Sequence, residues 1–122
     1  MDAAYPFLTQ IVRPTDLHRL SDKELHEVAR EVRQAILDHV SQTGGHLSSN
    51  LGTVELTVAM YAAYSIPPDK VVWDTGHQAY PHKLLTGRLE RFPTLRKHGG
   101  MSGFLKRDEH ELDAFGAGHA GT

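Results

Sequence analysis

The sequence predicts an α/β fold, in which helices flank a mainly parallel sheet. Two stretches with helical periodicity precede one short β-branched run at 70–74, and a further helical stretch follows it. This order of elements is typical of the opening of an α/β domain. Because one strand cannot form a sheet, the partner strands are expected outside this chain. The chain has 122 residues, enough for one modest core.

The first helix is expected to begin after Ser21. Ser21 and Glu24 have the spacing of a capping box, in which each side chain accepts a hydrogen bond from the other residue's backbone N–H. Gly44 and Gly45 are expected to end this helix. Its apolar residues recur at the three- and four-residue steps of an amphipathic helix: Leu25, Val28, Val32, Ile36, Leu37 and Val40.

A second helix is predicted over 53–65, where apolar side chains occupy most of the circumference. A helix of this kind is expected to be buried on most sides. Pro67 and Pro68 end the helical pattern, because proline lacks the N–H that a continuing helix needs.

The segments after this helix predict a strand, a helix and a loop. The run at 70–74 is short, β-branched and apolar at its centre, which indicates a buried parallel strand. A helix is predicted to begin near Pro81 and to end before Gly87, since proline suits the first helical turn and glycine the residue after the last. Residues 96–111 combine glycines and charges without an apolar period, so they are predicted to form a flexible loop.

Composition excludes several classes of function. Lys and Arg number 13 against 15 Asp and Glu, a net charge of −2, whereas a general nucleic-acid binder carries a basic surplus. The chain has no Cys, hence no disulfide or thiolate site, which agrees with a reducing, cytoplasmic location. No apolar run is long enough to cross a membrane, and the N-terminal residues resemble no targeting peptide. We therefore expect neither a nucleic acid nor a membrane as partner.

Three polar turns are candidate sites. The turn before the second helix offers His46 and Ser49 where free backbone N–H groups favour a phosphate or carboxylate. The segment after the predicted strand offers His77, at the edge where ligands gather in open α/β sheets. In the turn at 116–119, glycines allow backbone N–H groups to approach a phosphate closely.

Ordinary structural roles remain open for all three turns. The first can supply helix caps, and in the second Asp74 can cap the next helix and hold His77 by a hydrogen bond. The turn at 116–119 fails the dinucleotide-binding fingerprint, because no predicted strand precedes it.

The nine histidines raise the question of a metal site. Neither His26 nor His110, each followed by a glutamate, has the second histidine four residues later that a zinc-protease helix requires. The sequence therefore predicts no metal site built from this chain alone. Three histidines on or near the first helix lie among charged residues and are expected to be solvated: His18, His26 and His39.

Three stretches of sequence, in order, closely resemble the 1-deoxy-D-xylulose-5-phosphate synthase family. They are Gly45-His46 with 51–57, then 73–83, then 99–104, and the middle one is highly specific. The likeness runs from about Thr15 to the last residue. This family belongs with the transketolases among thiamine-diphosphate enzymes, and its chains are several times longer. The resemblance implies the N-terminal part of a thiamine-diphosphate-binding, transketolase-like domain.

The resemblance implies a transferase that condenses pyruvate with D-glyceraldehyde 3-phosphate and releases carbon dioxide, at the start of the non-mevalonate isoprenoid pathway. Thiamine diphosphate and Mg²⁺ are the implied cofactors, with the metal ligands outside this chain. The implied partners are the remainder of the same enzyme, as a second polypeptide, and a homodimer of the full enzyme. Residues 1–122 end on a glycine-rich turn, as if cut within a larger protein. The isolated chain is therefore expected to be inactive.

The resemblance also implies roles for individual residues. His46 and His77 are the implied catalytic residues, which exchange protons with the substrate or orient it. Cofactor contacts are implied for Ser49, His77, Gly118, His119 and Ala120. The family usually has serine where Ala120 stands, so a hydroxyl contact is lost there while backbone contacts can remain.

Two alternatives stay open beside the synthase. A transketolase, or a split transketolase subunit, shares the cofactor and fold but transfers two-carbon units; the segment 73–83 favours the synthase. A free-standing histidine-rich binding module would fold as a stable monomer with weak metal affinity. Glu55, in the second helix, is assigned a structural role rather than proton transfer to the cofactor.

Overall fold

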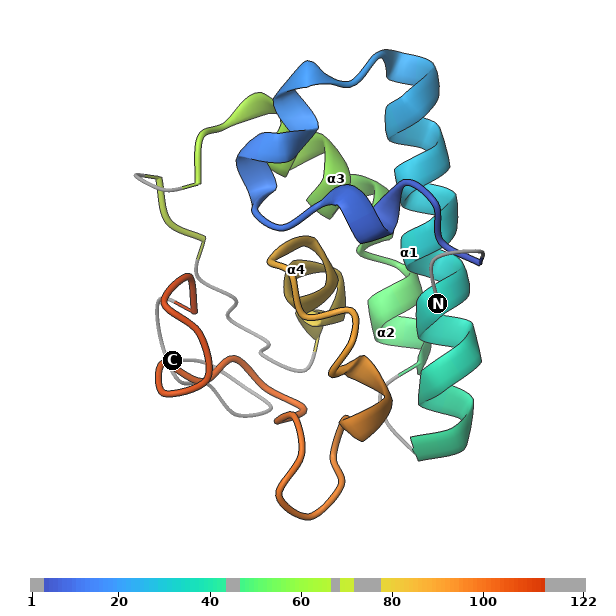
Figure 1. The fold of residues 1–122 in the computed structure, drawn as a ribbon, viewed down its shortest axis with the longest axis vertical. Helices are drawn as coiled ribbons and strands as arrows, with labels where there is room; N and C mark the ends of the chain where they lie inside the picture. Colours follow the sequence, from blue (N-terminus) through green and yellow to red (C-terminus); the bar gives the residue numbers. More distant parts are fainter. Residues whose placement is uncertain (1–3, 44–46, 67–68, 72–77, 114–122) are drawn as a thin grey trace.

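The computed structural model describes residues 4–43, 47–66, 69–71 and 78–113, in which helices alternate with turns and loops (Figure 1). The α-helices are α1 (Asp22–Thr43), α2 (Leu47–Leu51), α3 (Val54–Ala63) and α4 (Tyr80–Leu85). Short 3-10 helices are η1 (Leu8–Gln10), η2 (Pro14–Arg19) and η4 (Phe92–Thr94). α4 lies at the centre, between α1 and the loops that follow α4 (Figure 1).

The start of α1 confirms the predicted capping box. The Ser21 backbone N–H donates to the Glu24 carboxylate at 2.9 Å, and the Glu24 N–H donates to Ser21 Oγ at 3.2 Å. The two bonds satisfy N–H groups that the first helical turn leaves without partners. α1 ends at Thr43, while the predicted stop at Gly44 and Gly45 lies outside the described residues.

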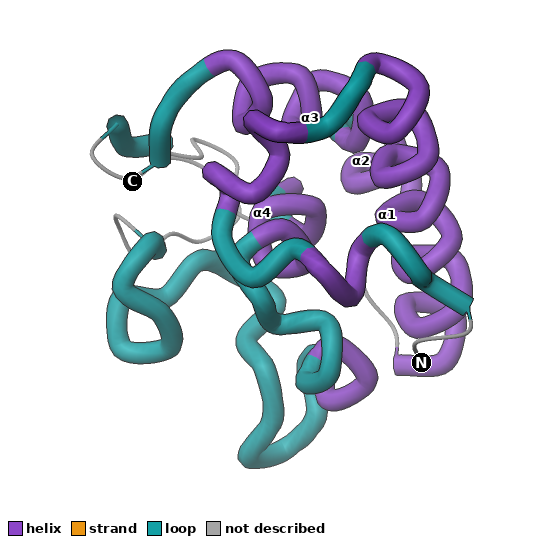
Figure 2. The backbone as a smooth tube through the Cα atoms, turned by 45° about the horizontal axis from the view of Figure 1, so that its top comes forward, coloured by secondary structure: helices purple, strands orange, loops and turns teal. Residues whose placement is uncertain are grey.

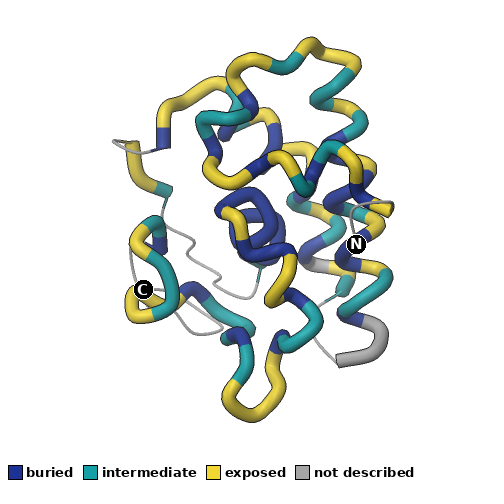
Figure 3. The backbone as a smooth tube through the Cα atoms, viewed as in Figure 1, coloured by how far each residue is buried: buried dark blue, intermediate teal, exposed yellow. Residues whose placement is uncertain are grey.

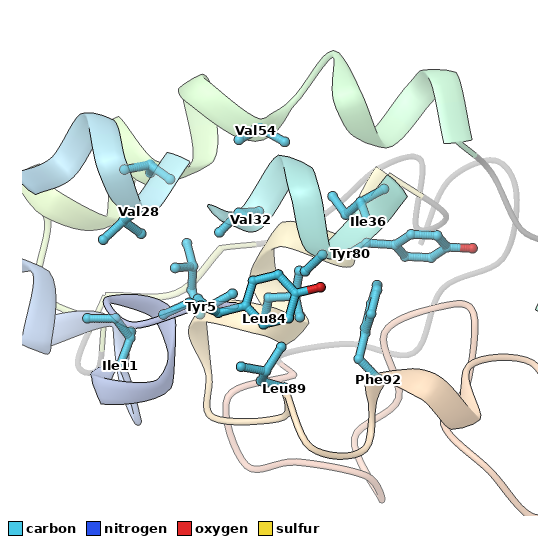
Figure 4. Packing of buried hydrophobic residues seen from close by; sticks show 14 of the residues in the cluster. Tyr5, Ile11, Val28, Val32, Ile36, Val54, Tyr80, Leu84, Leu89 and Phe92 are labelled. Carbon is cyan, nitrogen blue, oxygen red and sulfur yellow. The ribbon is translucent and has the colours of Figure 1, made fainter. Parts of the chain in front are cut away.

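The core forms where α1, α3, α4 and the N-terminal segment meet (Figure 4). One face of α1 supplies the buried residues Val28, Val32 and Ile36, which follow the predicted helical spacing. The buried Glu31 carboxylate accepts the backbone N–H of Leu8 at 2.8 Å, which fixes η1 against α1. The amphipathic pattern of α1 therefore organises the N-terminal half of the chain.

His39 differs from its expectation. It was expected to be solvated, but its ring lies 6.5 Å from that of Tyr5 and 5.9 Å from that of Phe92, centroid to centroid. Burial lowers the pKa of His39, against the opposing charge of Asp38. The reason is its position beside Ile36 on the core-facing side of α1. His18 and His26 are exposed, as expected.

α3 confirms the predicted second helix but not its burial. One face is buried, through Val54, Thr57, Val58 and Tyr61, whereas Leu56 is 57% exposed. The expectation of burial on most sides is wrong for this chain, because no described residue covers the opposite face.

α4 confirms the helix predicted near Pro81, and all of its residues are buried (Figure 3). Gly87 follows it with φ +85°, a conformation that residues with a Cβ rarely adopt. A Cβ at Gly87 would also lie 2.7 Å from the Val12 backbone oxygen. The predicted glycine stop is therefore required by both the backbone and its neighbour.

No strand is present in the ranges that the structure describes (Figure 2). Of the predicted strand at 70–74, only Lys70 and Val71 are described, and both are coil. The sheet therefore stays a prediction. Residues 96–111 form turns and coil, with Met101 and Leu105 buried, and the predicted flexibility of this loop also stays a prediction. In the described part of the chain, no helix is both long and apolar enough to cross a bilayer.

Candidate functional site

Buried polar side chains gather on α4 and on the segments that contact it. We call this set the α4 network: Tyr61, His82, Lys83, Arg88, Glu109 and Asp113. His82 and Lys83 are fully buried, and Asp113 is only 2% exposed. Buried charges are costly unless they are paired and hydrogen-bonded, so each member must have a partner.

His82 forms the centre of a buried hydrogen-bond chain. Its Nε2 lies 2.9 Å from Asp113 Oδ1, and its Nδ1 lies 2.5 Å from the Tyr61 hydroxyl. An ionised carboxylate only accepts, so Nε2 carries the proton and Nδ1 accepts from Tyr61. Burial lowers the pKa of His82 despite the opposing effect of Asp113, which keeps the ring neutral. The chain therefore runs from Tyr61 through His82 to Asp113.

Arg88 joins this chain to a second ion pair. Its guanidinium donates to both Asp113 oxygens, at 2.6 and 2.9 Å, and to Glu109 at 2.8 Å. Lys83 Nζ donates to Glu109 at 2.7 Å and to the Ser102 carbonyl at 2.6 Å. Two cations thus face two carboxylates, and the formal charges cancel.

The pKa values of these groups follow from burial and pairing. Burial acts to raise the pKa of Asp113, but hydrogen bonds from His82 and Arg88 outweigh it and leave that pKa far below its ordinary value. Burial is likewise outweighed for Glu109, whose pKa is lowered by Lys83. Burial lowers the pKa of Lys83, and pairing with Glu109 opposes this. Both carboxylates are therefore ionised near neutral pH.

The N-terminal end of α4 is tied to the segment that leads into α3. The Tyr80 backbone N–H donates to the buried Asn50 Oδ1 at 2.8 Å. Thr53 Oγ1 donates to the Gln78 carbonyl at 3.2 Å. These two bonds connect the segment that follows His46 with the one that follows His77.

The loop at 99–104 also contacts α4. The Ser102 carbonyl accepts from Lys83, and the Ser102 N–H donates to Glu109 at 2.9 Å. Gly100 has no room for a side chain, since a Cβ there would lie 2.2 Å from the Thr94 oxygen. The close approach of this loop to Thr94, in η4, therefore requires glycine at position 100.

Most predicted site residues lie outside the described residues: His46, His77, Gly118, His119 and Ala120. The backbone of Ser49 lies in α2, and its side chain is not described. Their neighbours are described, and they converge. Each of the three candidate turns has a described residue close to it in sequence. Asn50 and Asp113 bond to α4, and Gln78, just before α4, accepts from Thr53 at the start of α3.

Sequence reasoning missed the α4 network. His82 and Lys83 stand within the specific segment 73–83, which was the available signal, but their burial was not visible from spacing. Glu109 fell in the segment 96–111 predicted to be a loop, where charges are usually solvated, and Arg88 and Asp113 fell outside every predicted element. Pairing between residues 21 to 31 positions apart depends on tertiary contacts.

Glu55 has the structural role assigned to it. Its carboxylate accepts from Arg33 Nη2 at 2.5 and 2.7 Å across the α1–α3 contact, and both side chains are partly exposed. The hydrogen bond from Arg33 lowers the pKa of Glu55. Within the described ranges, no three His, Asp or Glu side chains are grouped to hold a metal ion.

Comparison with known sequences identifies close relatives. The sequence profile of 1-deoxy-D-xylulose-5-phosphate synthase matches residues 8–122. A protein of that name from Leptothrix cholodnii is 57% identical over 119 residues, which are 98% of this chain and 19% of the relative. Proteins of the same name from Polaromonas naphthalenivorans and Cupriavidus necator are 58% and 56% identical, respectively, over 97% of this chain. The chain spans about a fifth of the length of these relatives.

Proposed function

Because the chain belongs to the 1-deoxy-D-xylulose-5-phosphate synthase family, we propose that it forms the first part of the thiamine-diphosphate-binding domain of such a synthase. The complete enzyme is then a transferase that condenses pyruvate with D-glyceraldehyde 3-phosphate and releases carbon dioxide. Its product enters the non-mevalonate isoprenoid pathway. The proposed fold is α/β, with the parallel sheet completed by strands outside the described residues.

The observation that carries this proposal is the pair of bonds at the start of α4. Asn50 to Tyr80 and Thr53 to Gln78 hold the segment after His46 against the segment after His77. A site that needs both imidazoles requires these two segments to be neighbours. The geometry therefore supports His46 and His77 as parts of one catalytic site.

Each proposed site residue has a distinct task. His77 contacts the cofactor and exchanges a proton with a substrate oxygen, and His46 orients the substrate and assists that transfer. Ser49 offers a hydroxyl to the cofactor. The turn of Gly118, His119 and Ala120 offers backbone N–H groups, since Ala120 has no side-chain donor.

The described residues fit a supporting role toward the cofactor. Lys83 and Arg88 are fully occupied by Glu109 and Asp113, so neither cation is available to a diphosphate. Within the described ranges, no three His, Asp or Glu side chains are grouped to hold a metal ion. The Mg²⁺ ligands are proposed to lie outside this chain, as the resemblance to the family implies. When bound, thiamine diphosphate supplies a stabilised carbanion. The α4 network positions the segments that hold it.

The isolated chain is proposed to be inactive. The remainder of the enzyme, meaning the four-fifths of the relatives' length that this chain does not match, is its proposed partner. The complete enzyme acts as a cytoplasmic homodimer.

The test compares the purified chain with the complete enzyme. Carbon dioxide release from pyruvate, dependent on D-glyceraldehyde 3-phosphate, is expected only from the complete enzyme. In that enzyme, His77→Ala should lower the rate at least about 100-fold, because a positioned proton-transfer group contributes that much. The exposed Arg30→Ala serves as a control that leaves the rate unchanged. Turnover by the chain alone, or ketol transfer without carbon dioxide release, would contradict the proposal.

A further inference from the structure

α3 carries two apolar faces, of which the described chain covers one. The inner face consists of Val54, Thr57, Val58 and Tyr61, all buried. The outer stripe consists of Leu56, Ala59, Met60 and Ala63, which have the same three- and four-residue spacing. A helix that is apolar on opposite faces is typical of one packed on both sides.

The outer stripe is accessible in this chain. Leu56 is 57% exposed, Ala59 and Ala63 are exposed, and Met60 is half-buried. Tyr64, which follows the helix, is 60% exposed. These side chains place a continuous apolar strip in water, and such strips mark interaction surfaces more often than isolated exposed residues do.

Two grooves flank the outer stripe. Between α3 and α1, a groove of about 280 Å³ has a mixed lining of apolar and polar side chains: Leu25, Ala29, Val58 and Ala59 with Asp22, His26 and Glu55. On the other flank, a groove of about 450 Å³ is lined by Met60, Tyr64, Ile66 and Val71 together with Asp69 and Lys70. The stripe forms a ridge and the two grooves form recesses beside it. This shape suits an apolar partner surface whose own ridges can pack into the grooves.

We propose that the outer stripe of α3 and its flanking grooves are the docking surface for the remainder of the same enzyme. The length outside this chain supports that occupant, because about four-fifths of the relatives' length is not matched by the chain. The stripe itself carries no charge, whereas the grooves beside it are lined in part by Asp22, Glu55, Asp69 and Lys70. An apolar surface of the remainder with a polar rim matches this arrangement, because protein interfaces combine an apolar centre with a polar edge.

This proposal rests on the proposed function in one respect: it assumes that the remainder of the enzyme is the remainder of a synthase. It predicts that the outer stripe is inaccessible in the complete enzyme and accessible when the chain is alone. Burial of this stripe would also explain why α3 is apolar on two opposite faces.

The experiment uses the complete enzyme with single cysteines introduced on α3. The 122-residue chain contains no cysteine, so a thiol in it is always the introduced one, and peptide mass spectrometry separates it from thiols elsewhere. Leu56→Cys and Ala59→Cys report on the stripe. Arg30→Cys, on the exposed side of α1, is the control. The rate of modification by a neutral maleimide is measured in native enzyme and after denaturation.

The stripe cysteines should react at least about tenfold more slowly than the control in native enzyme, and equally fast after denaturation. If Leu56→Cys prevents folding, Ala59→Cys gives the answer, because it replaces one small residue by another. Equal native rates would overturn the proposal. Protection that disappears when the enzyme is diluted to monomers would assign the stripe to a second copy instead, and would also overturn it.

The labelling requires no activity, which separates this proposal from the proposed function. Protection in an enzyme that proves not to be a synthase would leave the docking surface intact and reject the function. Rapid modification of the stripe cysteines in an active synthase would reject the docking surface and leave the proposed function intact.

Discussion

Asp113 is the acceptor on which the α4 network depends. His82, Arg88 and the Lys106 backbone N–H all donate to its carboxylate. The Arg88 guanidinium is buried and depends on this carboxylate for two of its hydrogen bonds. Loss of this one carboxylate therefore affects both the tautomer of His82 and the neutralisation of Arg88.

Asp113→Asn should destabilise α4 strongly. Removing one partner of a buried ion pair costs about 3–5 kcal/mol, and here the buried cations Lys83 and Arg88 would be left to share the single carboxylate of Glu109. Hydrogen exchange at the amides of 80–88 in the complete enzyme measures this as faster exchange. The control is Asp108→Asn, an exposed carboxylate in the same loop, which should change the stability by less than about 0.5 kcal/mol. Equal protection from exchange in the two variants would mean that the ion pair of Asp113 with Arg88 contributes nothing to stability.

The lowered pKa of Asp113 predicts a direction for acid sensitivity. Burial acts to raise that pKa, but the bonds from His82 and Arg88 lower it well below the ordinary value of 3.8. As the pH falls toward the ordinary value, Asp113 binds a proton in the unfolded chain but not in the folded chain. The free energy of unfolding therefore decreases with acid. Urea midpoints measured from about pH 6 to pH 3 should fall less steeply in Asp113→Asn than in Asp108→Asn. Parallel curves would contradict the prediction.

At the scale of elements, α4 is the part to which the other segments are anchored. α2 and the start of α3 bond to its N-terminal end, and the loops at 99–104 and 109–113 bond to its side chains. Its end is set by Gly87, where the chain turns sharply against the N-terminal segment.

A matched pair of glycine variants tests this end of α4. Gly87 and Gly99 both have positive φ, but a Cβ at Gly87 would meet the Val12 oxygen at 2.7 Å, whereas a Cβ at Gly99 would meet nothing within 4 Å. Gly99→Ala should cost about 1–2 kcal/mol from backbone strain alone. Gly87→Ala should cost at least about 1 kcal/mol more, because the backbone must also move. Hydrogen exchange measures the loss of stability in each variant. Equal losses would contradict the prediction, because they would mean that the Val12 backbone moves aside without an energetic cost.

At the scale of the whole molecule, the chain exposes the second of two apolar faces of α3. Leu56 and Tyr64 are exposed, Ala59 lines the groove between α1 and α3, and Tyr64 lines the groove at Ile66. A chain with such a surface lowers its free energy by covering it.

The chain purified alone should therefore self-associate. Its mean mass by sedimentation should rise with concentration, and Leu56→Ser should weaken that rise, because it removes the most prominent apolar side chain of the stripe. Arg30→Ser, with an exposed polar side chain on α1, should leave the rise unchanged. A strictly monomeric chain at all concentrations would favour the free-standing module instead.

Local sequence patterns predicted α1, α3 and α4, whereas α2 and the three described 3-10 helices were not predicted. The capping box at Ser21, the periodicity of α1, the start near Pro81 and the stop at Gly87 are all confirmed. The strand at 70–74 and the sheet stay predictions. The burial of α3 on most sides and the solvation of His39 were wrong, because both depend on which neighbours are present.

The predicted site residues stay predictions, because most of them lie outside the described residues. The sequence singled out the three turns, and the bonds of Asn50 and Thr53 support placing the first two together. It did not identify the buried partners Arg88, Glu109 and Asp113, because charged residues in loops have the same pattern whether they are paired or solvated.

Local motifs, caps and periodicity were enough to identify the family of this chain and to place α1, α3 and α4, because these signals are encoded by nearby residues. The tertiary structure alone decided that α4 is buried with its charges, and that Asp113 pairs with His82 and Arg88. It also decided which face of α3 remains exposed. These features depend on contacts between distant residues, where burial makes an ion pair obligatory and a missing neighbour leaves an apolar face in water.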